Sequence, residues 1–228
     1  MMKTKTMNPF EEGRIILVNK PLFWTSADAV KKIRNRVHAK VGHAGTLDPL
    51  ATGLLILCTG KFTKKISEFM AQEKEYTGTI TLGATTPSYD LETARGDFRD
   101  FTQVSDDEVE LVAKRFTGEI LQVPPVYSAI KKDGMRSYDL ARQGKAVELK
   151  GRMVTIKKFD MQIGALPEIH FKVICSTGTY IRSLANDVGQ ALGCGAHLSS
   201  LCRTRIGEYR VEDAIDPESS DPIVKTGS

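Results

Sequence analysis

The sequence predicts an α+β fold, in which a mixed, mostly antiparallel sheet is flanked by helices. Strand-like and helix-like segments interleave along the chain without the regular βαβ spacing of a doubly wound sheet. The segment from Tyr76 to Leu82 places apolar residues and a glycine at alternate positions, with threonines between them, as in a strand that buries one face. The chain has 228 residues, of which 41% are hydrophobic, so it can build a substantial core.

The N-terminal part contains a strand, a helix and a second strand. Ile15–Val18 is short and apolar, and it ends at the triplet Asn19-Lys20-Pro21. We expect Ser26 to cap the following helix, with Asp28 in its first turn. The apolar face of this helix is formed by Val30, Ile33 and Val37. A glycine-rich segment then leads into Leu54–Cys58, which is typical of a buried strand.

The rest of the chain alternates between loops and regular elements. Residues 83–101 are polar and contain Pro87 and Gly96, so they are predicted to form a loop. Ser105 and Glu108 form a capping box for a helix that we expect to close at Gly118. Further elements follow in the order Val154–Phe159 (strand), Phe171–Cys175 (strand) and Ile181–Leu192 (helix, ending at Gly193). We expect one domain over residues 9–215 and a frayed tail over 216–228.

Positive charge is concentrated in two stretches, although the net charge is only +4. Residues 1–70 carry 12 basic and 5 acidic side chains, and residues 129–158 carry 9 and 3. Such clusters are what a polyanion-binding surface needs, and the alternative is ordinary solvated helix faces. Residues 124–152 are basic and begin with two prolines, so they are interpreted as a projecting insertion. No run approaches the ~20 apolar residues of a membrane span, and no signal-peptide core opens the chain, so a cytoplasmic location is expected.

The cysteines form no recognised metal motif, and one segment resembles a phosphate loop only in part. Cys194, His197 and Cys202 match no standard zinc spacing, and reduced structural thiols are the preferred interpretation. Cys58-Thr59-Gly60-Lys61 lacks both the upstream glycine and the following hydroxyl of a phosphate loop. We therefore expect no metal site among these residues.

The most informative stretch is residues 42–53, G-H-A-G-T-L-D-P-L-A-T-G. It places a single carboxylate, Asp48, among three glycines and a proline, directly before the apolar strand. Glycines permit backbone geometries that a Cβ forbids, and the following proline biases Asp48 away from helix. The pattern is how a protein presents one carboxylate to a substrate. The alternative is a tight turn in which Asp48 is the hydrogen-bonding residue.

The string extended to G-H-A-G-T-L-D-P-L-A-T-G-L-L resembles the signature of the TruB family of tRNA pseudouridine synthases. Further matching segments occur in the same order: Asn19-Lys20-Pro21, Lys74-Glu75-Tyr76, Pro124–Lys131, Gly178–Leu184 and Gly195–Thr204. The resemblance runs from about Ile15 to Val211. It implies the pseudouridine synthase fold with a catalytic cleft, with 124–152 as a thumb-like RNA clamp. Only 17 residues follow Val211, so a C-terminal PUA domain is not expected.

The resemblance also implies the activity, which is isomerisation of uridine 55 in the T loop of tRNA to pseudouridine. This reaction involves no redox change and no external group, so no cofactor is expected. Asp48 matches the catalytic aspartate, and whether it attacks the sugar, attacks the base or removes a sugar proton stays open. Arg182 matches the arginine that pairs with this aspartate, since a planar guanidinium can hold a carboxylate by two bonds. Tyr76 matches the active-site tyrosine, whose ring can stack on the extruded uracil; a core position for this tyrosine is compatible with that role.

The other matching positions are assigned to substrate binding. The resemblance implies that these residues contact or support the target nucleotide or hold the RNA: Lys20, His43, Tyr180, Leu201, Lys131 and Arg142. The expected partner is the T stem-loop of tRNA, with the base flipped out of the loop. We expect a monomer without an obligate protein partner.

Two further functions compete with this one. An RNA-binding or tRNA-folding protein without catalysis would have no use for Asp48, Tyr76 and Arg182 together. A catalytic subunit of guide-RNA (H/ACA) particles is a relative of the family, but it normally carries the PUA domain.

Overall fold

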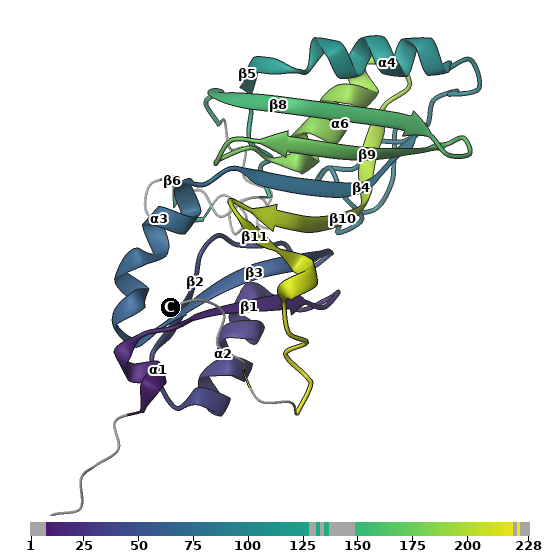
Figure 1. The fold of residues 1–228 in the computed structure, drawn as a ribbon. Coiled ribbons are helices and arrows are strands. Elements are labelled where there is room, and N and C mark those ends of the chain that lie inside the picture. Colours follow the sequence, from purple (N-terminus) through teal and green to yellow (C-terminus); the bar gives the residue numbers. More distant parts are fainter. Residues whose placement is uncertain (1–7, 128–130, 133–134, 137–148, 221–222, 224–228) are drawn as a thin grey trace, which may run out of the picture. The chain divides into compact units, whose positions relative to one another are not determined.

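The computed structural model describes residues 8–127, 131–132, 135–136, 149–220 and 223 (Figure 1). The chain forms two compact units. The first comprises residues up to Tyr76 and from Cys202 onward, and the second comprises Thr77–Leu201. Two strands, β4 (Lys74–Leu82) and β10 (Ala196–Ile206), contribute residues to both units.

The first unit is built around a small sheet in which β1, β3 and β10 are hydrogen-bonded in that order. Strand β3 pairs antiparallel with β1 and with β2, and β11 pairs antiparallel with β10. Its elements in chain order are α1 (Pro9–Glu12), β1 (Ile15–Lys20), α2 (Ser26–Val37), β2 (Val41–His43), β3 (Ala51–Thr59), the 3-10 helix η1 (Gly60–Lys65), α3 (Ile66–Ala71), β11 (Tyr209–Arg210) and the 3-10 helix η2 (Val211–Asp213).

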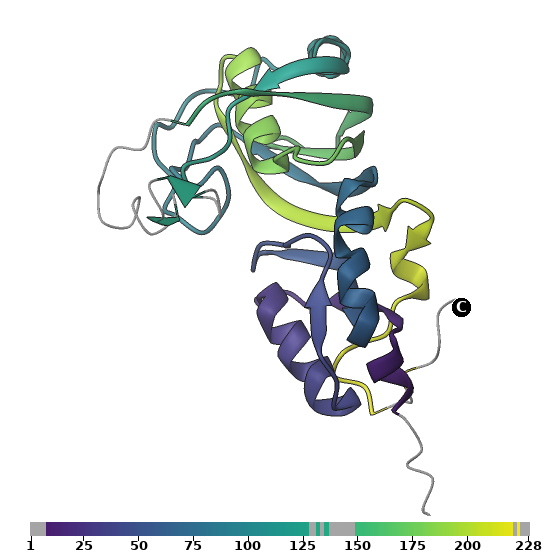
Figure 2. The ribbon, with the colours of Figure 1, turned by 90° about the vertical axis from the view of Figure 1, so that its left-hand side faces the viewer.

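Alternate residues of β3 enter two different cores, as the period of a strand requires. Leu55 and Leu57 pack with Ile33 and Val37 of α2. Leu54 and Ile56 face the other way and pack with Phe69 of α3. The two helices accordingly cover opposite faces of this sheet (Figure 2). The predicted strand at Leu54–Cys58 is confirmed, and it is longer than the apolar run.

The start of α2 differs from the prediction by one residue. The N-cap is Thr25, whose hydroxyl accepts from the Asp28 amide while the Asp28 carboxylate accepts from the Thr25 amide. Ser26 is instead the first helical residue, and it is buried. A Thr-Ser pair offers two hydroxyls to the same helix start, so the local sequence alone could not decide between them.

The second unit is a five-stranded arrangement hydrogen-bonded in the order β10, β4, β9, β8 and β5, with α4 packed on β8 and α6. The pairs β5–β8 and β8–β9 are antiparallel. The elements not yet named are α4 (Asp106–Arg115), β5 (Gly118–Gln122), β8 (Arg152–Ile163), β9 (Glu168–Cys175) and α6 (Ile181–Ala191). The capping box at Ser105, the loop over 83–101 and the helix ending before Gly193 are confirmed. Gly118 is a correction, because it opens β5 instead of closing α4, which ends two residues earlier at its cap Phe116.

The predicted insertion over residues 124–152 is only partly described. Lys131–Lys132 (β6) pairs antiparallel with Met135–Arg136 (β7), so the described part contains a short pair of strands. The helical pattern near residues 138–142, including Arg142, lies outside the described residues. At the other end of the chain, Ile215 bridges to Val18 of β1, and Ser219 donates to the Asp216 carbonyl in a turn.

Two features are absent from the described part of the chain. It contains no helix that is both long enough and apolar enough to cross a membrane. It also holds no group of three or more histidine, cysteine or carboxylate side chains placed to bind a metal ion.

The backbones of β3 and β10 approach each other closely at Gly53. Its φ is 102°, and a Cβ there would lie 2.4 Å from the Arg203 carbonyl oxygen. Gly118 has nearly the same φ, 103°, but open space around it. We expect Gly118→Ala to cost roughly 1–2 kcal/mol of unfolding free energy from backbone strain alone. Gly53→Ala should cost about 3 kcal/mol or more, because backbone must also move. Urea unfolding of both variants measures the difference, and equal losses would contradict the close approach.

Candidate active site

The candidate catalytic carboxylate lies at the tip of a β-hairpin. Strands β2 and β3 pair from Val41↔Thr59 to His43↔Leu57, and the Ala44 amide extends the ladder by donating to Ile56. Residues 45–50 then form the loop, and the Ala51 amide closes it by donating to the Asp48 carbonyl at 3.0 Å. Gly45 has a φ of 101°, which explains the need for glycine at this turn. Asp48 is half-buried, and its loop leads directly into the buried strand as the sequence predicted.

The loop is held from two sides. The Leu47 amide donates to Ser26 Oγ at 2.9 Å, and the same hydroxyl lies 3.2 Å from the Leu47 carbonyl as donor. On the other side of Asp48, the Phe23 amide donates to the Pro49 carbonyl at 2.8 Å. The residues flanking Asp48 are therefore fixed by Ser26, at the start of α2, and by Phe23, in the connection between β1 and α2. Such fixed backbone is how a site presents one carboxylate without paying for its ordering on binding.

Two buried cations belong to the same unit as Asp48. Lys20 has a relative exposure of 0%, and its ammonium donates to the carbonyls of Pro21 and Trp24 at 2.9 and 2.6 Å. Arg203 of β10 is 1% exposed and donates to the Leu54 and Gly45 carbonyls at 2.8 and 3.1 Å. Arg203 thus ties β10 to the start of the Asp48 loop at Gly45 and to the strand after it at Leu54. Buried charges of this kind need such partners, because an unpaired one is costly.

The electrostatics of Lys20 connect these groups. Burial lowers the pKa of the Lys20 ammonium from its usual 10.5 to about 8; the negative charge of Asp48 opposes this shift and the positive charge of Arg203 adds to it. Burial, followed by the charge of Arg203, also lowers the pKa of His43 below its usual 6.5. His43 is therefore a neutral, half-buried imidazole at pH 7, suited to packing or hydrogen bonding but not to carrying charge.

Lys20 gives a testable pH dependence of stability. Its pKa is lower in the folded than in the unfolded state, so between pH 8 and 10.5 the unfolded chain binds more protons. The Lys20 contribution to stability must therefore rise with pH across this window. In Lys20→Met this contribution should be absent. Urea unfolding at pH 8 and 10 measures the change for both proteins, and an identical change would contradict the depressed pKa.

Tyr76 and Tyr180 occupy different environments. Tyr76 lies in β4 and is 7% exposed, so the core position considered for it is correct, and its stacking role stays a prediction. Tyr180 is half-buried and precedes α6. Its amide donates to Gln122 Oε1 at 2.7 Å, and Gln122 Nε2 donates to its carbonyl at 3.1 Å. The Arg152 guanidinium lies 4.8 Å from the centre of the Tyr180 ring, as in a cation–π contact. Tyr180 is therefore held by both its backbone and its ring.

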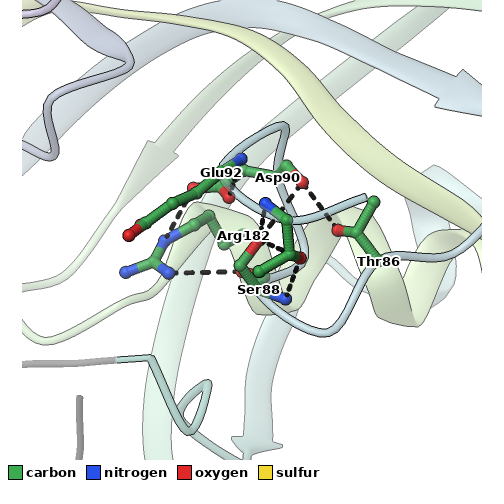
Figure 3. Close-up of polar contacts among 6 residues, drawn as sticks. Thr86, Ser88, Asp90, Glu92 and Arg182 are labelled. Carbon is green, nitrogen blue, oxygen red and sulfur yellow. Dashed lines mark hydrogen bonds and ion pairs between the residues drawn. The ribbon is translucent and has the colours of Figure 1, made fainter. Parts of the chain in front are cut away.

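Arg182, the second predicted catalytic residue, is buried in the second unit (Figure 3). Its Nη1 donates to the Ser88 carbonyl at 3.2 Å, and its Nε lies 3.7 Å from Asp90 Oδ2. Both side chains of this ion pair are 6% exposed. Asp90 is thus an ion-pair partner of Arg182. Asp48 belongs to the other unit, so its predicted pairing with Arg182 stays a prediction.

Asp90 is held by the loop over residues 83–101. Its Oδ1 accepts from the Glu92 amide at 2.9 Å, while its carbonyl accepts from the hydroxyls of Thr86 and Ser88 (Figure 3). A bridge between Asp90 and Leu198 anchors this loop to β10. The loop therefore delivers a carboxylate at a fixed position beside Arg182.

A family model for the N-terminal domain of TruB pseudouridylate synthases matches residues 31–181, which is more than half of the chain. The chain belongs to the TruB family. A second model, for the C-terminal domain of tRNA pseudouridylate synthase B, matches residues 182–219.

Curated TruB relatives are similar over almost their whole length. The tRNA pseudouridine synthase B of Flavobacterium johnsoniae is 53% identical over 219 residues, covering 92% of this chain and 96% of the relative. The enzyme of the same name from Phocaeicola vulgatus is 51% identical, covering 92% of both chains. Among solved structures, a chain of a Cbf5-Nop10-Gar1 complex matches with a TM-score of 0.70 and 31% identity. That match covers 91% of this chain, which spans only 53% of the solved chain. The pseudouridine synthase fold predicted from sequence is confirmed.

The predicted site residues of this TruB chain are distributed over both units. Lys20, His43, Asp48 and Tyr76 belong to the first, while Tyr180, Arg182 and Leu201 belong to the second. Lys131 lies in β6, where only the backbone pairing is described.

Sequence reasoning missed two buried residues of the TruB chain. Arg203 was part of a matched segment, but its contact with the hairpin tip spans 149 positions and has no local signal. Asp90 shares its loop with Asp97 and Asp100, which are exposed, whereas Asp90 is 4% exposed. Only this burial separates the three carboxylates, and it is a property of the fold.

Proposed function

We infer that the protein is a tRNA pseudouridine(55) synthase, which isomerises uridine 55 in the T loop of tRNA to pseudouridine. The observation that carries this inference is the 53% identity, over 96% of its length, to a relative named tRNA pseudouridine synthase B. The loop that presents Asp48 supports it, because this reaction needs one well-placed carboxylate and this loop fixes the residues on both sides of Asp48.

The reaction rearranges bonds within one nucleotide. The N1–C1′ bond breaks, the uracil rotates, and C5 bonds to C1′. The proton on C5 is removed and N1 gains one, so atoms and electrons balance without an oxidant or a group donor. We propose that no cofactor takes part. The enzyme must supply a carboxylate, a surface that holds the detached base, and a route for the C5 proton.

We propose Asp48 as the catalytic carboxylate, acting on the sugar or the base or as the base that removes a sugar proton. The neighbouring charge of Lys20 attracts the charge of Asp48, and this supports a role for Lys20 in holding the site together. Arg182 is proposed to pair with the Asp48 carboxylate. Tyr76 is proposed to stack on the uracil and assist proton transfer at C5.

The remaining residues are proposed to bind the nucleotide and its surroundings. His43, Tyr180 and Leu201 would contact the flipped uridine. A base that is stacked in the loop cannot reach these residues without being extruded. Lys131 and Arg142 would hold the RNA from the insertion over 124–152. We propose one catalytic domain over residues 9–215, a cytoplasmic monomer, and the tRNA T stem-loop as the partner, without an obligate protein subunit.

The test is pseudouridine mapping on a T-loop hairpin incubated with the protein alone. We expect modification at the single target uridine and none when that uridine is replaced by cytidine. The similarity to a Cbf5 chain makes guide-dependent activity the second candidate. If the hairpin is modified only after a guide RNA and accessory proteins are added, that candidate replaces the first.

A further inference from the structure

A basic basin of about 900 Å³ opens in the first unit, where the end of α2, the start of β2 and the start of η1 meet. Four lysine or arginine side chains line it, with one histidine and one carboxylate, and all six residues are exposed. These residues are Arg34, Lys40, Lys61, Lys64, His38 and Glu11. In the following this group is called the basin.

The positive charges of the basin outnumber its one carboxylate, Glu11, and form no ion pair with it. Among the described residues, none of its four lysine and arginine side chains forms an ion pair with a carboxylate. Elsewhere on the surface such pairs exist, as between Lys114 and Glu110 at 2.6 Å. Four unpaired cations around one hollow produce a positive potential that favours an anion.

The backbone beneath the basin is closely packed. The Gly60 amide donates to the Lys40 carbonyl at 2.8 Å, which joins η1 to the start of β2. A Cβ at Gly60 would lie 2.1 Å from the Glu11 carbonyl oxygen, so α1 packs directly on η1. Asn8 Nδ2 donates to the Val37 carbonyl at 2.8 Å and so ties α1 to the end of α2. The four cations therefore project from a fixed floor.

The chemistry of the lining favours phosphate over a base. Besides the cations it offers Asn35 and Thr63, which can donate hydrogen bonds to phosphate oxygens. Among the described residues, no phenylalanine, tyrosine or tryptophan lines the basin, and the His38 imidazole is its one ring, so groups that can contact phosphate outnumber groups that can stack on a nucleobase. A hollow with this lining suits the sugar–phosphate backbone of a nucleic acid.

The basin is separate from the catalytic hairpin tip. Ser26, at the first position of α2, contacts Leu47 beside Asp48, whereas the basin lies at the other end of this helix. Twelve helical residues span about 18 Å. We propose that the basin binds the phosphate backbone of the tRNA substrate outside the modified loop. This proposal rests on the proposed function, since it takes tRNA as the substrate.

The test compares two double variants that remove the same charge. Lys61→Gln/Lys64→Gln removes two cations from the basin. Lys114→Gln/Lys158→Gln removes two exposed cations that are already paired with Glu110 and Asp160. Binding of whole tRNA and of a T-loop hairpin with a short stem is measured against salt concentration. Thermal unfolding checks that both variants are folded, and Arg34→Gln/Lys40→Gln replaces the first pair if it melts early.

The basin variant should lose two phosphate contacts with whole tRNA. The slope of log K against log salt should then become shallower by about 1.4–1.8, with roughly 10- to 30-fold weaker binding near ~0.1 M salt. Hairpin binding and hairpin isomerisation should stay within about twofold of wild type, because the short stem does not reach the basin. The control variant should match wild type with both RNAs.

Two results would overturn the proposal. One is an unchanged slope for whole tRNA in the basin variant. The other is an equal loss in the control variant, which would mean that only the overall charge matters. Failure of the proposed function has a different signature: wild-type protein would leave the hairpin uridine unmodified. The tRNA-binding comparison would still decide the basin in that case, because it does not depend on catalysis.

Discussion

Replacing Asp48 by asparagine is expected to reduce pseudouridine formation by roughly 10³-fold or more, with hairpin binding within about threefold of wild type. Asparagine keeps the shape of the side chain but removes its negative charge and its nucleophilic oxygen. The loop should persist, because its described bonds use the backbone of residues 47, 48, 49 and 51 and the hydroxyl of Ser26. Single-turnover isomerisation of a T-loop hairpin, with binding measured separately, separates chemistry from affinity.

The matched control for this variant is Asp107→Asn. Asp107 undergoes the same chemical change in the first turn of α4, where it is exposed. Its isomerisation rate should equal that of wild type. Asp48→Asn retaining more than about a tenth of the wild-type rate would show that Asp48 is a turn residue and that another group carries the chemistry.

Replacing Arg182 by methionine is expected to have the second largest effect, on both stability and activity. It would leave Asp90 buried at 4% exposure without its ion-pair partner. Breaking a buried pair in this way typically costs about 3–5 kcal/mol of unfolding free energy. Activity should fall by roughly 10²-fold or more, because a guanidinium would be lost from the proposed site.

A double-mutant cycle separates these two contributions. In Arg182→Met/Asp90→Asn the buried Asp90 charge is removed together with its partner, so much of the stability lost in Arg182→Met should return. Activity should not return if Arg182 serves the reaction itself. Urea unfolding and single-turnover rates of the four proteins make the comparison. Recovery of activity together with stability would show that Arg182 is a structural residue only.

The sequence was sufficient for the elements with strong local signals. The alternation of Tyr76 to Leu82 predicted β4, and the capping box at Ser105 predicted the start of α4, because each depends on residues within one element. The glycine-rich segment predicted the loop that presents Asp48. Local sequence did not decide where helices and strands end. Thr25 and Ser26 compete to cap the same helix, and Gly118 can close a helix or open a strand.

The support of the site could not be predicted, because it depends on contacts between distant residues. Ser26 holds Leu47 across 21 positions, and Arg203 reaches Leu54 across 149. The burial of Lys20 follows from packing between β1 and the chain after it, which composition does not record. Matching family segments marked Lys20 and Arg203 as positions of interest, but only the fold shows what each one touches.

The discontinuity of the first unit has a consequence for how the protein is made. A ribosome delivers the hairpin that carries Asp48 early, yet Arg203, which donates to the carbonyls of Gly45 and Leu54, follows them in the chain by 158 and 149 residues. Residues 77–201, which belong to the other unit, are synthesised in between. The nascent chain therefore carries an unfinished Asp48 loop throughout most of its synthesis. The hydrogen bonds from Arg203 to this loop can form only after β10 has left the ribosomal exit tunnel and joined the unit that contains β1.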